Sequence, residues 1–301
     1  MVNKIMSLRS RIISYCINQR WTLGFTEQSL QEVLSGAPLD FHYIKHSYKD
    51  RWFADPFILD YDREYIWVLV EEYLDSTKLG RISKLKIDRG SYQLLEITPV
   101  LELDTHLSFP AIIRKGEKIY IYPENAAGLG LALYEYNPKD DKCTLVKTIG
   151  EAPFADAIIT DVFGEKLMFS THMPNHNGNI LTVHRFEEGN PIFDQDVILP
   201  SNIARNAGDW FTLNNKVYRP AQDCNGGIYG GAVILQEVEK KNGRFAFKDI
   251  RRIESTCKKY TTGCHTFNHY KGMMVIDVHG YRHICAAKIF DTMYILKKKF
   301  S

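Results

Sequence analysis

Polar side chains recur at one place in five segments of this sequence, where an apolar run begins or ends. Asp55, Glu124 and Asp156 are acids among them. An ionised carboxylate can take a proton from a hydroxyl group, and a protonated carboxyl group can give one to a leaving oxygen. Pairs of such groups break glycosidic bonds. We therefore predict that Asp55, Glu124 and Asp156 are catalytic residues that act on a carbohydrate.

Basic, amide and aromatic side chains occur in the same five segments. Arginine and histidine can hold a phosphate or a sugar carboxylate, and an aromatic ring beside them can stack on a sugar ring. This mixture favours a phosphate-bearing sugar over a plain glycan. The residues that we predict to bind substrate are Trp52, Glu72, His106, His172, Arg205, Arg219, Gln222, Asp223, His265 and Asp277.

The five segments form an internal repeat. Each contains an apolar run, a turn made mostly of Gly, Asn, Asp or charged residues, and a second apolar run that ends in a polar residue, which is the pattern of a β-hairpin. The equivalent positions are 54, 47, 50 and 59 residues apart, and they are Asp55, Phe109, Asp156, Asn206 and His265. Blades of known β-propellers repeat every 40 to 50 residues or so. The predicted fold is an all-β, five-bladed β-propeller; a β-sandwich would not require this register.

The repeat also predicts the domain boundaries. We expect a propeller over residues 21–301, with blades near 50–100, 104–150, 154–199, 203–253 and 262–298. Each hairpin is followed by a third strand-like run, which in the last blade is Arg282 to Lys288. Leu39 to Ile44 is expected to close the ring against the first or the last blade, because an open ring leaves strand edges unpaired. In a blade the first strand lies nearest the axis, so the recurring polar residues should surround one axial opening.

Residues 1–20 are expected to form a short, basic, amphipathic helical extension. Ile5, Leu8 and Ile12 share one face of this helix, which could contact an anionic membrane surface or dock on the propeller. The sequence has no signal-peptide pattern, no apolar run of membrane-spanning length and no paired cysteine motif. We therefore expect a cytoplasmic protein, with membrane association through residues 1–20 as an open alternative.

Charge and metal-ligand spacing exclude other classes of function. The net charge of +2 and the pI of about 8.1 are too balanced for a nucleic-acid-binding domain. His172 and His176, like His265 and His269, are four residues apart but lie in strand and turn sequence, where that spacing does not form a zinc site. We predict no cofactor and no metal ligands, while a single divalent cation on the propeller axis stays open.

Several strings resemble known families. Trp52-Phe53-Ala54-Asp55-Pro56-Phe57 resembles the motif that opens the first blade of the five-bladed glycoside hydrolases, the clan of arabinanases, β-xylosidases, invertases and levansucrases. A fuller set over residues 20–290 resembles the propeller domain at the N-terminus of plant glucosamine inositolphosphorylceramide transferase and its bacterial counterparts. That set consists of Trp21 to Phe25, Ala54 to Phe57, His106 to Pro110, Tyr122-Pro123-Glu124, Ala155-Asp156-Ala157, Tyr218 to Asp223 and Tyr229-Gly230.

The resemblance implies a role for Asp55 as base or nucleophile. The hydrolases' second-blade Asp, which tunes the acid, corresponds to Ser108 or Phe109, and their third-blade acid corresponds to Glu151 or Asp156. The acid therefore does not carry over, and Glu124 and Asp156 are both candidates.

Three functions follow from these residues. The first is glycosyl transfer or phosphorolysis in cell-surface polysaccharide biosynthesis, by an enzyme whose partner is a sugar, a sugar phosphate or a nucleotide sugar. The second is glycoside hydrolysis with Asp55 as base, and the third is non-catalytic sugar binding.

Overall fold

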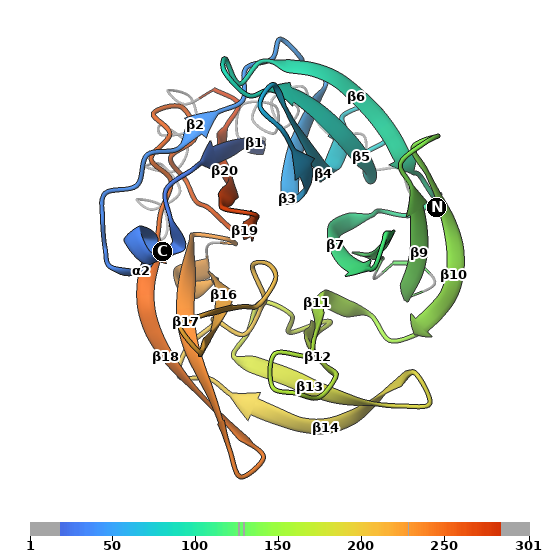
Figure 1. Cartoon of the computed structure of the whole chain (residues 1–301), viewed down its shortest axis with the longest axis vertical. Helices are drawn as coiled ribbons and strands as arrows, with labels where there is room; N and C mark the ends of the chain where they lie inside the picture. Colours follow the sequence, from blue (N-terminus) through green and yellow to red (C-terminus); the bar gives the residue numbers. More distant parts are fainter. Residues whose placement is uncertain (1–18, 126, 129, 228, 284–301) are drawn as a thin grey trace, which may run out of the picture.

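The computed structural model describes residues 19–283 except 126, 129 and 228, and it confirms the five-bladed propeller. Five antiparallel sheets of four strands each surround a central axis (Figure 1). One short α-helix near the N-terminus, α2 (Leu30–Leu34), lies outside the sheets, and its first turn is capped by Ser29 and Glu32. Among the described residues, no helix is long and apolar enough to cross a membrane.

Four of the sheets are each formed by four consecutive strands. The first contains β3 (Arg51–Tyr61), β4 (Tyr65–Leu74), β5 (Leu79–Asp88) and β6 (Leu94–Leu101). The second contains β7 (Ser108–Lys115), β8 (Lys118–Glu124), β9 (Leu131–Asn137) and β10 (Lys142–Gly150). The third contains β11 (Phe154–Thr160), β12 (Leu167–His172), β13 (Ile180–Glu187) and β14 (Asn190–Ile198). The fourth contains β15 (Phe211–Leu213), β16 (Lys216–Asp223), β17 (Ala232–Lys241) and β18 (Arg244–Ile253), and a short 3₁₀ turn, η1 (Asn225–Gly227), follows β16.

The fifth blade joins the two ends of the described chain. Its order is β19 (Phe267–Tyr270), β20 (Met273–Tyr281), β1 (Gln19–Thr26) and β2 (His42–Tyr43). The predicted closing segment therefore does contribute its residues 42–43, but as the outermost strand, paired with β1. The place beside β20 that we predicted for Arg282 to Lys288 is taken by β1, which pairs with β20 over its full length. The alternating apolar residues of β1 explain this pairing, because Leu23 and Phe25 are both fully buried.

Some predictions fall on residues that the structure does not describe. The predicted helical extension and its membrane contact lie outside the described residues, apart from Gln19 and Arg20, which belong to β1. The same is true of residues 284–298 of the predicted fifth blade.

The predicted register is visible in the backbone of the first three blades. Asp55, Phe109 and Asp156 have positive φ values of 50°, 46° and 42°. Each lies in a β-bulge of the strand nearest the axis, where the pairing with the next strand skips two residues. A bulge turns a side chain away from the regular alternation of a strand. The repeat therefore identifies the positions at which the backbone redirects a side chain, at the same end of each blade.

Closure through β1 predicts a large loss of stability for Phe25→Ala. Phe25 is fully buried in a cluster that also contains Phe53 of the first blade and Val275 of β20. Its phenyl group therefore packs between the first and the last blade, where the propeller closes. Removing a buried phenyl group typically costs about 3–5 kcal/mol. Urea unfolding should show that loss. Phe193→Ala is the matched control, because that ring is 59% exposed and its loss should cost less than about 1 kcal/mol. Equal effects of the two substitutions would contradict the closing role of β1.

Candidate functional site

A hollow of about 190 Å³ lies where the first strands begin and the second strands end; we call it the axial hollow. Residues from all the blades except the third line it, because these strand ends converge on the axis. The lining residues are Trp21, Trp52, Asp55, Glu71, Tyr73, His106, Ser108, Glu124, Arg205, Tyr229 and His265.

Six of the predicted site residues line this hollow: Trp52, Asp55, His106, Glu124, Arg205 and His265. Sequence reasoning missed Trp21, Glu71, Tyr73, Ser108 and Tyr229 as site residues. A signal was present for Glu71 and Tyr73, since side chains two apart on a strand share a face. We chose Glu72, which lies on the opposite face of β4. Trp21 and Tyr229 belong to the strings that carried the family resemblance.

Asp55 is held by the backbone and side chains of two neighbouring blades. Its Oδ2 accepts a hydrogen bond from the Phe109 amide at 3.0 Å, and its Oδ1 accepts one from the Thr266 hydroxyl at 2.9 Å. Burial raises the pKa of Asp55 to about 7, against the nearby positive charge of His265. This carboxyl group can therefore exchange a proton near neutral pH.

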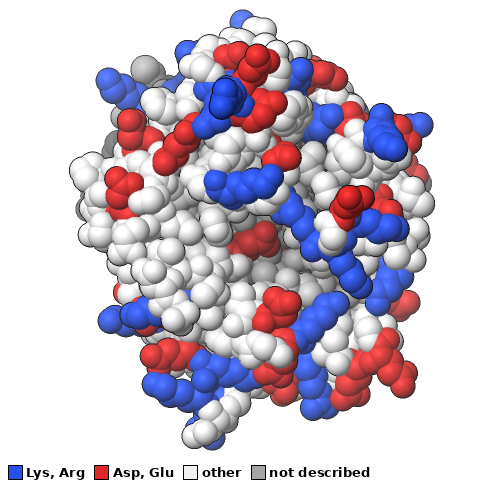
Figure 2. Space-filling view, viewed as in Figure 1, with Lys and Arg blue, Asp and Glu red and all other residues white. Residues whose placement is uncertain are grey.

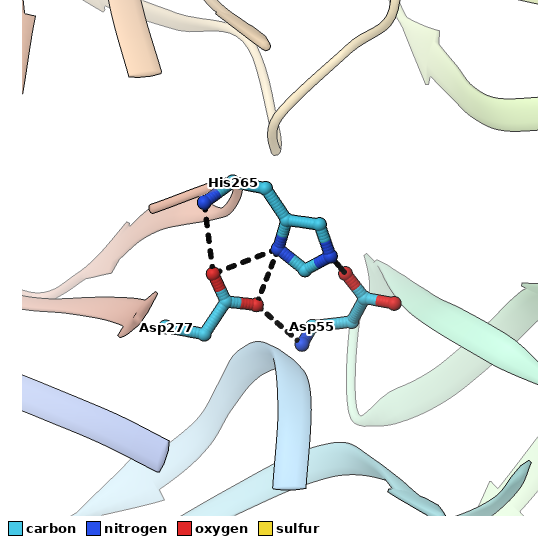
Figure 3. A group of neighbouring side chains, drawn as sticks. All are labelled: Asp55, His265 and Asp277. Carbon is cyan, nitrogen blue, oxygen red and sulfur yellow. Dashed lines mark hydrogen bonds and ion pairs between the residues drawn. The ribbon is translucent and has the colours of Figure 1, made fainter. Parts of the chain in front are cut away.

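A buried pair of His265 and Asp277 supports Asp55 (Figure 3). Asp277 accepts hydrogen bonds from the backbone amides of Asp55, His265 and Thr266 and contacts His265 Nδ1 at 2.7 Å. His265 Nε2 lies 3.5 Å from Asp55 Oδ1. Burial alone would lower the pKa of His265, but Asp277 and Asp55 outweigh burial and raise it to about 9. The imidazole is therefore a cation at neutral pH, placed between two carboxylates.

Asp55, His265 and Asp277 are also close enough together to hold a metal ion. A metal ion there would have to displace the proton of His265 and compete with the hydrogen bonds that both oxygens of Asp277 accept. The contacts drawn in Figure 3 connect the three residues into a network that positions Asp55.

Glu124 is held on the other side of the hollow by Arg205 and Asp156. Its Oε2 accepts from the Asp156 amide at 2.9 Å and from Arg205 Nη2 at 3.3 Å, and no hydrogen bond to a described residue holds Oε1. Burial raises the pKa of Glu124 to about 8, although Arg205 opposes the rise. Glu124 is therefore mostly protonated at neutral pH and has one oxygen that it can offer to a ligand.

Asp156 lies beneath the hollow and positions Arg205. Arg205 Nε donates to Asp156 Oδ2 at 2.5 Å, and Gln222 Nε2 donates to the same oxygen at 2.6 Å. Asp156 is 1% exposed and does not line the hollow. Of the two candidate acids, the geometry therefore favours Glu124, and Asp156 and Gln222 act through Arg205.

The remaining predicted residues lie outside the axial hollow. Glu72 is fully buried and binds Arg51, Arg81 and Ser83. Arg219 is also fully buried, and its guanidinium donates to Asn206, to Gln236 and to the carbonyls of Ile203 and Ala204.

Asp223 and His172 contact residues outside the axial hollow. Asp223 forms an ion pair with Arg252 and caps the turn at Asn225. His172 packs against Phe154 and His184 in the third blade.

Aromatic rings and a second histidine complete the wall of the hollow. Trp21 lies 4.0 Å from the ring of His265, and Trp52 stacks on Tyr73 at 4.6 Å. His106 Nε2 contacts Glu71 at 3.3 Å, and although burial alone would lower the pKa of His106, this contact raises it above its ordinary value.

On the face shown in Figure 2, Lys and Arg are interspersed with Asp and Glu around a central depression that has acidic side chains at its bottom.

Gly230 sets the position of the loop that carries Tyr229. Its φ is +59°, and a Cβ added there would lie 2.4 Å from the Cβ of His265. Only glycine lets this loop approach His265 so closely, and the Tyr229 ring then stands edge-on to the imidazole at 5.3 Å.

Known proteins are similar to this chain in sequence or in fold. The glucosamine inositolphosphorylceramide transferase 1 proteins of Oryza sativa subsp. indica and subsp. japonica are each 28% identical to this chain over 207 residues. The aligned part is 64% of this chain and 27% of the relatives, so the chain matches about a quarter of their length.

Among solved structures, Zg3597, a family 117 glycoside hydrolase of the marine bacterium Zobellia galactanivorans, superposes with a TM-score of 0.50. The superposition covers 86% of this chain and 90% of that one at 10% identity, which shows a shared fold alone. Residues 41–282 match the family described as "Glucosamine inositolphosphorylceramide transferase 1, N-terminal". Since that match covers most of the chain, the protein belongs to this family.

Proposed function

We propose that this domain binds one sugar unit in the axial hollow and transfers a glycosyl group, with Asp55 as general base and Glu124 as general acid. The observation that carries the proposal is that both carboxyl groups line one hollow and have pKa values near neutrality, about 7 and about 8. Pairs of carboxyl groups tuned in this way indicate acid and base roles. The transferase name of the rice relatives supports transfer over other sugar chemistry.

In the proposed reaction, ionised Asp55 takes the proton of an acceptor hydroxyl group. The acceptor oxygen then attacks the anomeric carbon of the bound sugar, and the bond to the leaving oxygen breaks. Cationic His265, 3.5 Å from Asp55 Oδ1, stabilises the ionised form of this base. A base is most effective when its pKa is near the working pH, which the burial of Asp55 achieves.

Glu124 gives its proton to the leaving oxygen in the same step. Its Oε2 is fixed by Arg205 and the Asp156 amide, so Oε1 is the oxygen that faces the reaction. Arg205 remains beside the carboxylate that forms when the proton leaves. The positive charge of Arg205 therefore stabilises the product state of the acid.

The walls of the hollow suit a single sugar ring. Its volume of about 190 Å³ is below the roughly 300–1,000 Å³ of pockets for larger organic ligands. Trp21 and Trp52 offer aromatic surface, and Glu71 and His106 offer polar groups to ring hydroxyls. We further propose that the donor sugar is phosphorylated or nucleotide-linked, because a phosphate is a better leaving group than the hydroxyl group of another sugar.

Glycoside hydrolysis is the second candidate. Two observations favour it. Arg205 already forms ion pairs with Asp156 and Glu124, and Arg219 is buried away from the hollow, where it donates to Asn206. Neither arginine is left to hold a phosphate inside the hollow. Incubating a bound donor with and without an acceptor alcohol separates the two: transfer gives a new glycoside, and hydrolysis gives only the free sugar.

A thermal-shift screen of sugars, sugar phosphates and nucleotide sugars tests the proposed function. A ligand at a hundred times its Kd should add about 2.7 kcal/mol to stability, which raises Tm by roughly 5–10 °C. Trp52→Ala should reduce the shift because Trp52 lines the axial hollow. Trp67→Ala is the matched control, since Trp67 lines a separate pocket with Lys84 and Arg114. A screen without a hit, or an undiminished shift in Trp52→Ala, would rule out sugar binding in this hollow.

A further inference from the structure

A second hollow of about 310 Å³ adjoins the axial hollow. Trp21 and Trp52 line both, and their ring centroids are 6.2 Å apart, so these two rings form the shared wall. Five of its lining residues are Lys or Arg, and none of those that the structure describes is Asp or Glu. We call it the basic hollow, and its cations are Arg20, Lys49, Arg51, Lys259 and Arg282.

Three of these cations are fixed in place by carboxylates behind them. Arg20 donates to Asp75 at 2.9 Å, and Arg282 contacts the same carboxylate at 3.5 Å. Both arginines also donate to the Lys49 carbonyl. These contacts hold the guanidinium groups rigidly but offset part of their charge.

Arg51 is held in the same way and shapes the floor beside Trp52. It donates to Asp50 at 2.8 Å and to Glu72 at 2.7 Å, and its guanidinium lies 5.0 Å from the Tyr48 ring centroid. The carboxyl group of Glu72, predicted from the sequence as a ligand contact, therefore acts by fixing an arginine of the basic hollow.

Lys49 and Lys259 supply the charge that is not offset. Both side chains are exposed, and neither has a carboxylate within ion-pair distance among the described residues. Lys259 Nζ lies 5.0 Å from the Tyr260 ring centroid, which holds it at the hollow. Two lysines beside three fixed arginines form a region of positive potential, next to an axial hollow whose lining holds three acids.

We propose that the basic hollow binds the phosphate group of a ligand whose sugar ring occupies the axial hollow, an inference that rests on the proposed function. A phosphate placed in the axial hollow itself would face the carboxyl groups of Asp55, Glu71 and Glu124. Beyond the Trp21–Trp52 wall it meets only cations, aromatic rings and histidines. The ligand class is a phosphate ester of a sugar or of a sugar-like cyclic polyol, either soluble or part of a lipid headgroup.

Inorganic phosphate tests the basic hollow directly, by calorimetric titration at constant ionic strength. Lys49→Glu/Lys259→Glu should weaken phosphate binding roughly tenfold to a hundredfold, as expected for charge-assisted hydrogen bonds. Lys139→Glu/Lys142→Glu is the matched control, with the same charge change on the β9–β10 hairpin, at the other end of the strands. Unchanged binding in the Lys49/Lys259 variant, or equal loss in the control, would overturn the proposal.

Two further probes distinguish the source of the phosphate. A thermal shift with glucose 1-phosphate that is reduced in the Lys49/Lys259 variant supports a soluble ligand. Cosedimentation with phosphatidylinositol vesicles, but not with phosphatidylcholine vesicles, that is lost in the same variant supports a lipid headgroup. Absence of both responses would overturn the inference.

A neutral sugar separates this inference from the proposed function. A neutral sugar that binds the wild type should bind the Lys49/Lys259 variant equally well, because the axial hollow is intact. If that sugar binds but phosphate binding does not depend on Lys49 and Lys259, only the basic hollow is refuted. If phosphate binding depends on Lys49 and Lys259 but no sugar binds, the proposed function fails. The proposal that one ligand occupies both hollows then fails with it.

Discussion

Asp55→Asn should lower kcat/KM for sugar transfer by roughly 10²–10⁴-fold, the contribution typical of a general base. The amide is close in size to the carboxyl group and can still accept a hydrogen bond, but it cannot take a proton. In the wild type, activity should fall below pH 7 as Asp55 is protonated and above pH 8 as Glu124 ionises. The fall in activity below pH 7 should be absent in the variant. A pH profile of kcat/KM for both proteins measures this difference.

Asp55→Asn should also change His265. Asp55 is one of the carboxylates that raise the pKa of His265 to about 9 against burial, so its neutralisation should lower that pKa, which an NMR titration of the imidazole can follow. Asp60→Asn is the control, because Asp60 is an exposed residue at the other end of β3, paired with Lys271. Full turnover in Asp55→Asn would exclude Asp55 as the base. Sugar binding without any turnover in the wild type would favour a non-catalytic module.

Asp277→Ala should destabilise the fold by about 3–5 kcal/mol, the usual result of removing one partner of a buried ion pair. The substitution leaves the backbone amides of Asp55, His265 and Thr266 without their acceptor and His265 without its nearest carboxylate. Because burial then dominates, the pKa of His265 should fall below its wild-type value of about 9. Urea unfolding measures the loss of stability.

The pH dependence of this loss has a defined sign. A histidine whose pKa is raised in the folded state contributes stability that is complete below its unfolded pKa of about 6.5 and is lost as pH rises through about 9. The difference between wild type and Asp277→Ala should therefore be larger at pH 6 than at pH 9.5. Asp223→Ala serves as the comparison, because its ion pair with half-exposed Arg252 is expected to contribute less than about 1 kcal/mol. A loss in Asp277→Ala no larger than in Asp223→Ala would show that Asp277 does not hold the site together.

The sequence predicted the blades because the repeat records a local constraint. Asp55, Phe109 and Asp156 each lie in a β-bulge with positive φ, and these polar or aromatic residues recur in the sequence about 50 residues apart. The pairing of β1 with β20 could not be found in this way. It joins residues about 250 positions apart in the chain, and no local pattern specifies which strand completes the last blade.

The sequence predicted which strand ends form the candidate site, but not which side chains at those ends face the hollow. Choosing Glu71 over Glu72 required knowing how the bulge at Asp55 sets which side chains of β4 face the hollow. Arg205 and Arg219 are equally plausible in the sequence, yet one lines the hollow and the other donates to buried carbonyls of the preceding loop. Which donor meets a backbone carbonyl depends on the loop conformation, which the repeat does not encode.

A crystal structure with the tightest-binding saccharide from the thermal-shift screen would show whether the axial hollow is the sugar-binding site. We expect the sugar ring to lie in the axial hollow, against Trp21 and Trp52 and within hydrogen-bond distance of Asp55 and of Glu124 Oε1. A ligand bound instead beside Arg114 and Asp209, in a separate pocket of the propeller, would contradict it.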